Sequence, residues 1–437
     1  MHLDHPIPPQ HKIFIGLLVG AVAGLMANLA ARDSSGLGHF LHYVADPVGQ
    51  IFLRLLLMIV LPLIFTSISL SLADFENPGD LARIGGKTLA IFLLITALGA
   101  ILGVMPVRSV RPPGTISAAR QQEFISAYGL GKGALPGGEE SLGIGTLVGL
   151  VPSNILAAAS GGELTGVMLF AVMFGVALSR VALATRNFVV RFLDGVNQAL
   201  ERMVAAVMWL APVGVAALIF SAIARFGYSM LQLLGLYLLV LMASLFIFQF
   251  VVLGILAWLL AYIRPFAFFR KSSLPMLTAL ATASSTATLP TTMQAASDEF
   301  AIADDVVHFV VPLSATLSRG GTALFSAMTV LFLAQIFGIP ISTSARIWLA
   351  ILTTITSLGV AGIPAGAVPM LNFLLNATGV PAAGLALVLG IEQVTGMVRT
   401  VPNVTGGMLA ACIVGRKQQV AGRPGEMSGG AKLHASV

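Results

Sequence analysis

Long apolar runs separated by short polar segments dominate the chain. Three of these runs, 13–31, 88–107 and 231–262, exceed the roughly 18 residues that a helix needs to cross a bilayer. Backbone groups in lipid must be paired within the segment, so such runs are expected to be helices rather than strands. The pattern predicts an all-α polytopic membrane protein. Its first helices are expected near 12–32, 41–74, 81–107, 145–184, 187–225 and 228–263.

Two apolar segments after residue 264 carry a polar interruption near their middle. The segment 272–293 holds a serine- and threonine-rich stretch, 282–290, and the segment 341–374 holds a stretch with three glycines and a proline, 356–366. Paired interruptions of this kind point to a transporter binding site. We predict two re-entrant helical hairpins, whose helix N-termini favour an anion. The alternative is two kinked spanning helices.

Each predicted hairpin is followed by a helix with unusual polar content. The helix expected over 312–337 contains Ser-Arg-Gly-Gly at 318–321, which predicts an unwound segment. In the last helix, expected over 382–414, five residues are spaced 4, 3, 4 and 4 and therefore share one helical face. These residues are Glu392, Gly396, Arg399, Asn403 and Gly407.

Arg399 is the residue on that face that most needs an explanation. A charge near the bilayer centre costs about 2.5–3.5 kcal/mol even on the most lenient scale, so Arg399 must face protein or water. Its guanidinium binds a carboxylate bidentately. Glu392 lies two turns away, about 10 Å along the helix, and could pair with it. We favour an anionic substrate as the partner, because the hairpin dipoles independently indicate an anion.

Charge is scarce and lies mainly between the apolar runs. The chain is 57% hydrophobic and 10% charged, whereas soluble domains are about a quarter charged. Its net charge of +6 is concentrated in short connections such as 180–191, 264–271 and 416–417. That distribution follows the positive-inside rule and does not indicate nucleic-acid binding. We expect a protein of the cell (inner) membrane with both termini in the cytoplasm.

Motifs of enzymes are missing from the sequence. Its one cysteine, Cys412, allows no intrachain disulfide. The sequence contains no Cys/His metal cluster, phosphate-binding glycine loop or nucleophile elbow. We therefore expect no enzymatic activity and no cofactor, and we expect a small anion and the lipid bilayer as partners.

Three motifs resemble the dicarboxylate/amino acid:cation symporter family. Ser-Ser-Thr-Ala-Thr-Leu-Pro at 284–290 resembles its serine-rich first hairpin, and Ala-Gly-Ile-Pro at 361–364 resembles its second. Arg-Thr-Val-Pro-Asn-Val-Thr-Gly at 399–406 is similar to its signature Arg-Thr-x-x-Asn-Val-x-Gly. The resemblance covers nearly the whole chain. It implies substrate contacts from Ser284, Ser285, Thr322, Gly362, Arg399, Thr400 and Asn403.

The resemblance also implies a glutamate-transporter-like elevator fold with eight transmembrane helices and two re-entrant hairpins at about 264–298 and 341–376. The protein would be a homotrimer held together by a scaffold domain. A transport domain would move the site across the membrane, with the second hairpin as a gate. The implied boundaries are 12–75 and 145–225 for the scaffold, 80–108 and 226–415 for the transport domain, and 416–437 for a cytoplasmic tail.

The chain departs from the family where the family binds cations. The motif Asn-Met-Asp-Gly-Thr appears as Ser-Arg-Gly-Gly-Thr at 318–322, and the aspartate that ends the last-helix signature is Gly407. Sodium sites in low dielectric need several oxygens and usually a carboxylate. In these two helices only Glu392 offers one, and Arg319 adds a positive charge that could substitute for a bound cation.

Further departures bear on the substrate. A Tyr and a Thr of another cation site correspond to Phe92 and Ile95, although Thr96 keeps a hydroxyl. The aspartate that binds the substrate's amino group corresponds to Gly396. These losses favour a dicarboxylate over an acidic amino acid.

The predicted function is secondary active transport, as a symporter, of a dicarboxylate or acidic amino acid. Sodium coupling through the usual sites is expected to be lost, which leaves proton coupling, facilitated diffusion or exchange. Glu392 would either carry a proton or pair with Arg399 or Arg319. The alternatives are an anion-conducting channel and a homologue that binds a ligand without transporting it.

Overall fold

The computed structural model describes residues 9–31, 34–73, 80–105, 152–160, 164–357 and 367–421, and the regular elements in these ranges are all helices. The helices of the first half are α1 (Pro9–Ala31), α2 (Ser35–Phe40), α3 (Asp46–Ala73), α4 (Asp80–Val104), α7 (Ile155–Ser160), α8 (Leu164–Leu178) and α9 (Leu183–Phe226). A π-helical turn, Leu41–Ala45, joins α2 to α3. The sequence prediction of one helix over 145–184 is wrong: α7 and α8 are separate, and 145–151 lies outside the described residues.

The second half begins with α10 (Tyr228–Ile247). This helix continues through two π-helical turns, Phe248–Val252 and Ala257–Ala261, with the single turn α11 (Leu253–Leu256) between them. The helices that follow are α12 (Pro265–Lys271), α13 (Ser273–Thr282), α14 (Leu289–Asp298), α15 (Asp304–Leu317), α16 (Gly320–Ile336), α17 (Thr343–Ser357), α18 (Val368–Ala377) and α19 (Leu385–Ala421).

The break predicted within 272–293 is confirmed. Helices α13 and α14 have 10 residues each, about 15 Å of helix or half a bilayer, and they pack on each other and on α19. Helices α17 and α18 form the second pair, whose connection, including Gly362, lies outside the described residues. The last helix was predicted over 382–414, and α19 extends beyond that prediction to Ala421.

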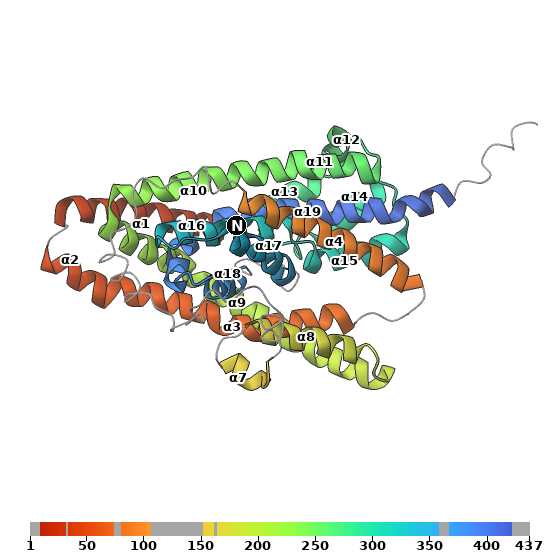
Figure 1. Ribbon diagram of the computed structural model, residues 1–437, viewed down its shortest axis with the longest axis horizontal. Coiled ribbons are helices and arrows are strands. Elements are labelled where there is room, and N and C mark those ends of the chain that lie inside the picture. The colour runs from red at the N-terminus through yellow and green to blue at the C-terminus, as the bar shows by residue number, and fades with distance from the viewer. Residues whose placement is uncertain are drawn as a thin grey trace, which may run out of the picture.

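The helices form two groups of neighbours. Helices α1, α3, α8 and α9 pack on one another, and α4 and α13–α19 form the other group. In Figure 1, α10 runs along one edge of the molecule and α3 and α8 along the other, with α13–α19 between them. Glycines permit the closest approaches between helices. A Cβ at Gly20 of α1 would overlap the carbonyl oxygen of Ala216 in α9. A Cβ at Gly99 of α4 would overlap the carbonyl oxygen of Gly320 in α16.

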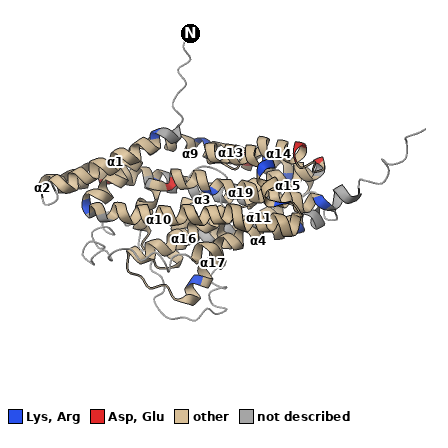
Figure 2. Cartoon of the chain, turned by 90° about the horizontal axis from the view of Figure 1, so that it is seen from above, with Lys and Arg blue, Asp and Glu red and all other residues tan. Residues whose placement is uncertain are grey.

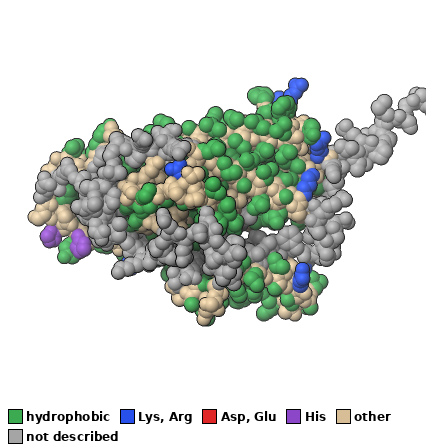
Figure 3. Space-filling view, viewed as in Figure 1, with side chains coloured by type: hydrophobic (Ala, Val, Ile, Leu, Met, Phe, Trp, Pro, Cys, Tyr) green, Lys and Arg blue, Asp and Glu red, His purple; other side chains and the backbone are tan. Residues whose placement is uncertain are grey.

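The outer surface suits lipid. Six helices in the described residues are long and apolar enough to cross a membrane. Large apolar side chains such as Trp209, Phe188 and Phe266 are 83%, 74% and 80% exposed, and the face drawn in Figure 3 is largely hydrophobic. Few charged side chains lie along the bundle, and a cluster of them lies at its end near α14 and α15 (Figure 2). The chain is a multi-pass membrane protein.

The α4–α16 contact yields a test of the packing. Gly99→Ala places a methyl group against the Gly320 carbonyl, and overpacking of this kind costs about 1–3 kcal/mol. We expect a lower thermal midpoint in detergent, measured by size-exclusion chromatography after heating. Gly86→Ala on the same helix is the control, because a Cβ there meets nothing within 4 Å. Equal midpoints for the two variants would contradict the close packing.

Candidate functional site

The helix predicted over 312–337 is interrupted at the glycine pair. Helix α15 ends at Leu317, α16 begins at Gly320, and Ser318 between them has an extended backbone. The Ser318 hydroxyl donates to the Asn403 carbonyl of α19 at 2.7 Å, which ties the break to the last helix. The predicted unwinding is therefore confirmed.

Arg319 lies in this break and is 2% exposed. Its guanidinium donates to the carbonyls of Ala315 and Thr316 at 2.5 and 3.0 Å, and to the Ser285 hydroxyl of the first hairpin at 3.3 Å. The carbonyls belong to the C-terminal end of α15, where the helix dipole favours a cation. All three partners are neutral, so no carboxylate in the described residues offsets this charge directly.

The first hairpin turns through its serine-rich tip. Ala283 has a left-handed backbone, with φ 53°, and ends α13. The Ser284 hydroxyl accepts from the Ala287 N–H at 3.2 Å, and the Thr288 hydroxyl donates to the Ser284 carbonyl at 2.7 Å. Ser284 and Ser285 are 8% and 5% exposed. Ser284 shapes the tip, and Ser285 connects it to Arg319.

Arg399 of α19 pairs with Glu392, which lies about two turns earlier on the same helix. Its Nη1 and Nη2 donate to the two carboxylate oxygens at 2.8 and 2.5 Å, and both residues are buried. The guanidinium also lies 4.5 Å from the centre of the Phe325 ring of α16, a cation–π contact. From the sequence, an anionic substrate was favoured over Glu392 as the partner of Arg399. The structure has the internal pair.

Asn403 and Thr322 join α19 to the start of α16. The Asn403 side-chain oxygen accepts from the N–H groups of Gly321 and Thr322 at 2.9 and 3.3 Å, and its amide donates to the Thr322 hydroxyl at 2.8 Å. These bonds satisfy N-terminal donors of α16 that have no partner within the helix. The Thr400 hydroxyl donates to the Gly396 carbonyl of its own helix at 2.7 Å. In this state Asn403 and Thr322 bridge two helices, the structural alternative to orienting a substrate.

Gly320, Gly396 and Gly407, where the family resemblance implies an aspartate, differ in the space around them. A Cβ at Gly407 would overlap the Ser314 side chain of α15, and a Cβ at Gly320 would lie 2.7 Å from the Phe248 ring. At Gly396 the nearest atom to a Cβ would be Arg399 Nη2, at 4.0 Å. Protein atoms thus fill the space beside Gly320 and Gly407, whereas no described residue fills the space beside Gly396, next to the arginine.

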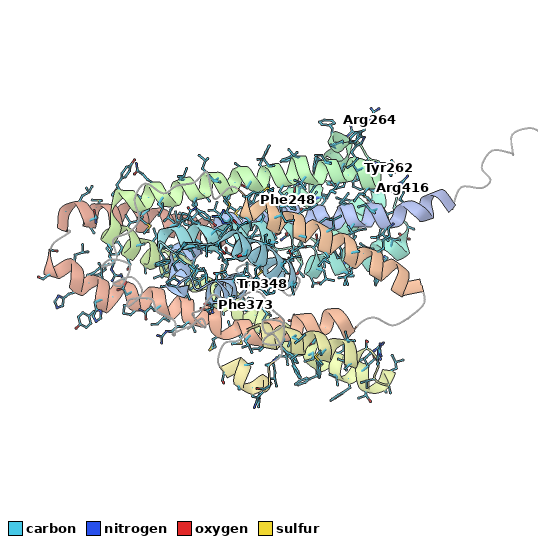
Figure 4. All side chains as sticks on the ribbon, viewed as in Figure 1. Phe248, Tyr262, Arg264, Trp348, Phe373 and Arg416 are labelled. Carbon is cyan, nitrogen blue, oxygen red and sulfur yellow. The ribbon has the colours of Figure 1, made fainter. Side chains whose placement is uncertain are left out.

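Two neighbouring residues of the π-helical turn that follows α10 were not among the predicted site residues. The Phe248 ring lies against Gly320, and Figure 4 labels it on the long helix that lies along the edge of the core. Gln249 is 3% exposed and donates to the Thr405 hydroxyl of α19 at 3.0 Å. Such π-helical turns occur often at functional sites. A glutamine within the apolar run 231–262 was the signal available in the sequence.

The site therefore has two buried guanidiniums, one carboxylate and hydroxyl groups from three elements. Arg319 and Arg399 are close enough to repel each other. The described residues contain no group of three or more His, Cys, Asp or Glu side chains that could hold a metal. In this arrangement a ligand carboxylate can bind Arg399 only if it displaces the carboxylate of Glu392.

Comparison with known proteins identifies the family. The family model for the sodium:dicarboxylate symporter family matches residues 10–417. The chain is 31% identical to the proton/glutamate-aspartate symporter of Escherichia coli (strain K12), over 87% of this chain and 89% of that protein. It is 30% identical to the proton/sodium-glutamate symport protein of Bacillus caldotenax, over 93% of each. It is also 30% identical to C4-dicarboxylate transport protein 2 of Polaromonas naphthalenivorans (strain CJ2), over 94% of this chain and 89% of that protein.

The space around Gly396 and Gly407 predicts how the stability of the protein changes when an aspartate is introduced at each position. Gly407→Asp must displace Ser314 and should lower the thermal midpoint of the purified protein, because overpacking costs about 1–3 kcal/mol before the buried charge is counted. Gly396→Asp is the matched control, since its carboxylate would enter open space beside Arg399. We expect the midpoint of Gly396→Asp to stay close to that of the unmodified protein. A greater loss for Gly396→Asp than for Gly407→Asp would contradict this account.

Proposed function

Because the chain belongs to the sodium:dicarboxylate symporter family, we propose that it is a secondary transporter of a small dicarboxylate or acidic amino acid in the cell (inner) membrane. The observation that carries the proposal is Arg399, which is buried, bidentately paired and enclosed by α16 and α19. Relatives that match over most of their length are named as glutamate-aspartate symporters and C4-dicarboxylate transporters. Both substrate classes carry the carboxylate that a guanidinium binds.

Substrate binding begins with an exchange of carboxylates at Arg399. Glu392 already has the planar, two-bond geometry that a substrate carboxylate would adopt, so the two compete for the same guanidinium. Once displaced, Glu392 would be a buried carboxylate that has lost its cation partner. Glu392 is therefore the residue that we assign to proton coupling.

Several observations argue against sodium at the usual positions. Phe248 occupies the place of a side chain at Gly320, and Ser314 occupies it at Gly407. Arg319 places a positive charge in the same break. A hard cation would meet repulsion where it needs oxygen ligands.

The packing supports an elevator motion. Gly99 and Gly103 hold α4 against α16 so closely that α4 would move with the helices that carry Arg319 and Arg399. We assign α4 and α10–α19 to a transport domain, and α1, α3, α8 and α9 to a scaffold that forms a homotrimer, with both termini in the cytoplasm. The hairpin α17–α18, which also contacts α3 and α8, would act as the gate.

Uptake into proteoliposomes tests the proposed function. We expect saturable uptake of labelled L-aspartate or succinate at the same initial rate in Na⁺ and in choline, because no sodium carboxylate remains beside Gly320 or Gly407. Empty liposomes provide the background. A strong requirement for Na⁺ would overturn the sodium argument, and the lack of any flux would overturn the transport proposal.

The carboxylate exchange at Arg399 has its own test. Glu392→Gln should lower the stability of the ligand-free protein, since removal of one partner of a buried pair costs about 3–5 kcal/mol. The same variant should bind succinate at least about tenfold more tightly, because no internal carboxylate competes. Binding is measured by the ligand-induced rise in thermal midpoint.

Two controls accompany that measurement. Glu299→Gln makes the same chemical change at an exposed position and should leave the affinity unaltered. Arg399→Ala should abolish the ligand-induced rise. Unchanged affinity in Glu392→Gln would show that the substrate does not compete for Arg399.

A further inference from the structure

The buried part of the proposed transport domain carries one uncompensated positive charge. Among the side chains of helices α4 and α10–α19 whose burial the structure describes, the charged ones with less than a tenth of their surface exposed are Arg319, Glu392 and Arg399. Two guanidiniums and one carboxylate leave a net charge of +1. The connection 358–366 of the second hairpin contains no Asp, Glu, Lys or Arg in its sequence, so it does not change this sum.

Arg319 is the source of that excess. Arg399 is neutralised by both oxygens of Glu392. The partners of Arg319 are two carbonyls and a hydroxyl, which solvate a cation without cancelling its charge. Its bonds hold it to the end of α15 and to the hairpin tip, so it must travel with any motion of these elements.

A fixed cation differs from a bound ion in one respect that matters for a transport cycle. A bound Na⁺ leaves on the far side, and the empty carrier returns without it. Arg319 cannot leave. A domain loaded with a net charge of −1 would cross the membrane electrically neutral, but the empty domain would have to return with a charge of +1 through the low-dielectric barrier and the membrane potential.

We propose that Arg319 makes this protein an exchanger, in which a substrate of net charge −1 moves inward mainly against outward movement of another. The load is a dicarboxylate together with one proton on Glu392, or an acidic amino acid that binds without a proton. This inference rests on the transport function proposed above. It adds that return of the empty domain is the slow step, and that Arg319 is the residue responsible.

The test uses the purified full-length protein in proteoliposomes whose lumen either lacks substrate or contains unlabelled L-aspartate. Labelled L-aspartate, and succinate in parallel, is added outside without Na⁺. We expect initial uptake to be at least about tenfold faster with internal substrate. An inside-positive K⁺ diffusion potential should speed the slow uptake into liposomes without internal substrate, because it favours outward movement of the positively charged empty domain.

The outcomes separate the two proposals. Equal uptake with and without internal substrate overturns the exchange mechanism and leaves the transport function standing. The absence of uptake in both overturns the transport function itself. Faster uptake under an inside-negative potential would contradict the sign of the charge on the empty domain.

Two variants assign the effect to Arg319. Arg319→Met keeps a long side chain without the charge, and acceleration by internal substrate should largely disappear together with the voltage effect. Arg319→Lys retains the charge and should retain both. Full acceleration in an active Arg319→Met protein would overturn the role of Arg319. If Arg319→Met does not fold, the measurements on the unmodified protein still decide whether exchange occurs.

Discussion

The buried guanidinium of Arg319 sets the arrangement of the elements around it. A guanidinium out of water needs oxygen acceptors for its N–H groups, and a regular helix through residues 314–322 would keep its carbonyls for its own hydrogen bonds. The break between α15 and α16 releases those of Ala315 and Thr316, and Arg319 takes both. Its third bond holds Ser285, so the same residue fixes the position of the first hairpin. The carbonyls released by the interrupted helix and the hydroxyl at the hairpin tip offset the cost of burying this cation.

Much of this architecture follows from the sequence, because the constraints are local. Polar interruptions inside apolar runs predict breaks, and the structure has them within 272–293 and after Leu317. The spacing of Glu392, Arg399 and Asn403 puts them on one helical face, and all three make contacts on that side. The separation of α7 from α8 was missed although the sequence has a polar interruption, Ser-Gly-Gly-Glu at 160–163, between them.

Contacts between segments distant in the chain were beyond the sequence argument. Loss of a carboxylate at Gly320 or Gly407 predicts a weaker cation site, but it does not say whether the space is empty or filled. Phe248, the first residue of a π-helical turn, fills it in one case, and Ser314 of α15, which packs against α19, fills it in the other. The choice between Glu392 and a substrate for Arg399 likewise depended on whether an arginine side chain could extend back over two turns. It does, with both oxygens engaged.

The Glu392 pair also bears on why the proposed substrate should have two carboxylates. When one carboxylate replaces another at Arg399, the bonds formed resemble the bonds lost, so the exchange alone contributes little affinity. Net binding must come from groups that Glu392 does not satisfy. Arg319 is the other buried cation of the site, its described partners are two carbonyls and a hydroxyl, and a carboxylate would add a charge–charge interaction with it. A second carboxylate on the ligand would gain that interaction, whereas a monocarboxylate would only substitute for Glu392. Selectivity for a dicarboxylate would then arise from Arg319, which lies between Ser318 and Gly320, the two positions where the family resemblance implies lost sodium ligands.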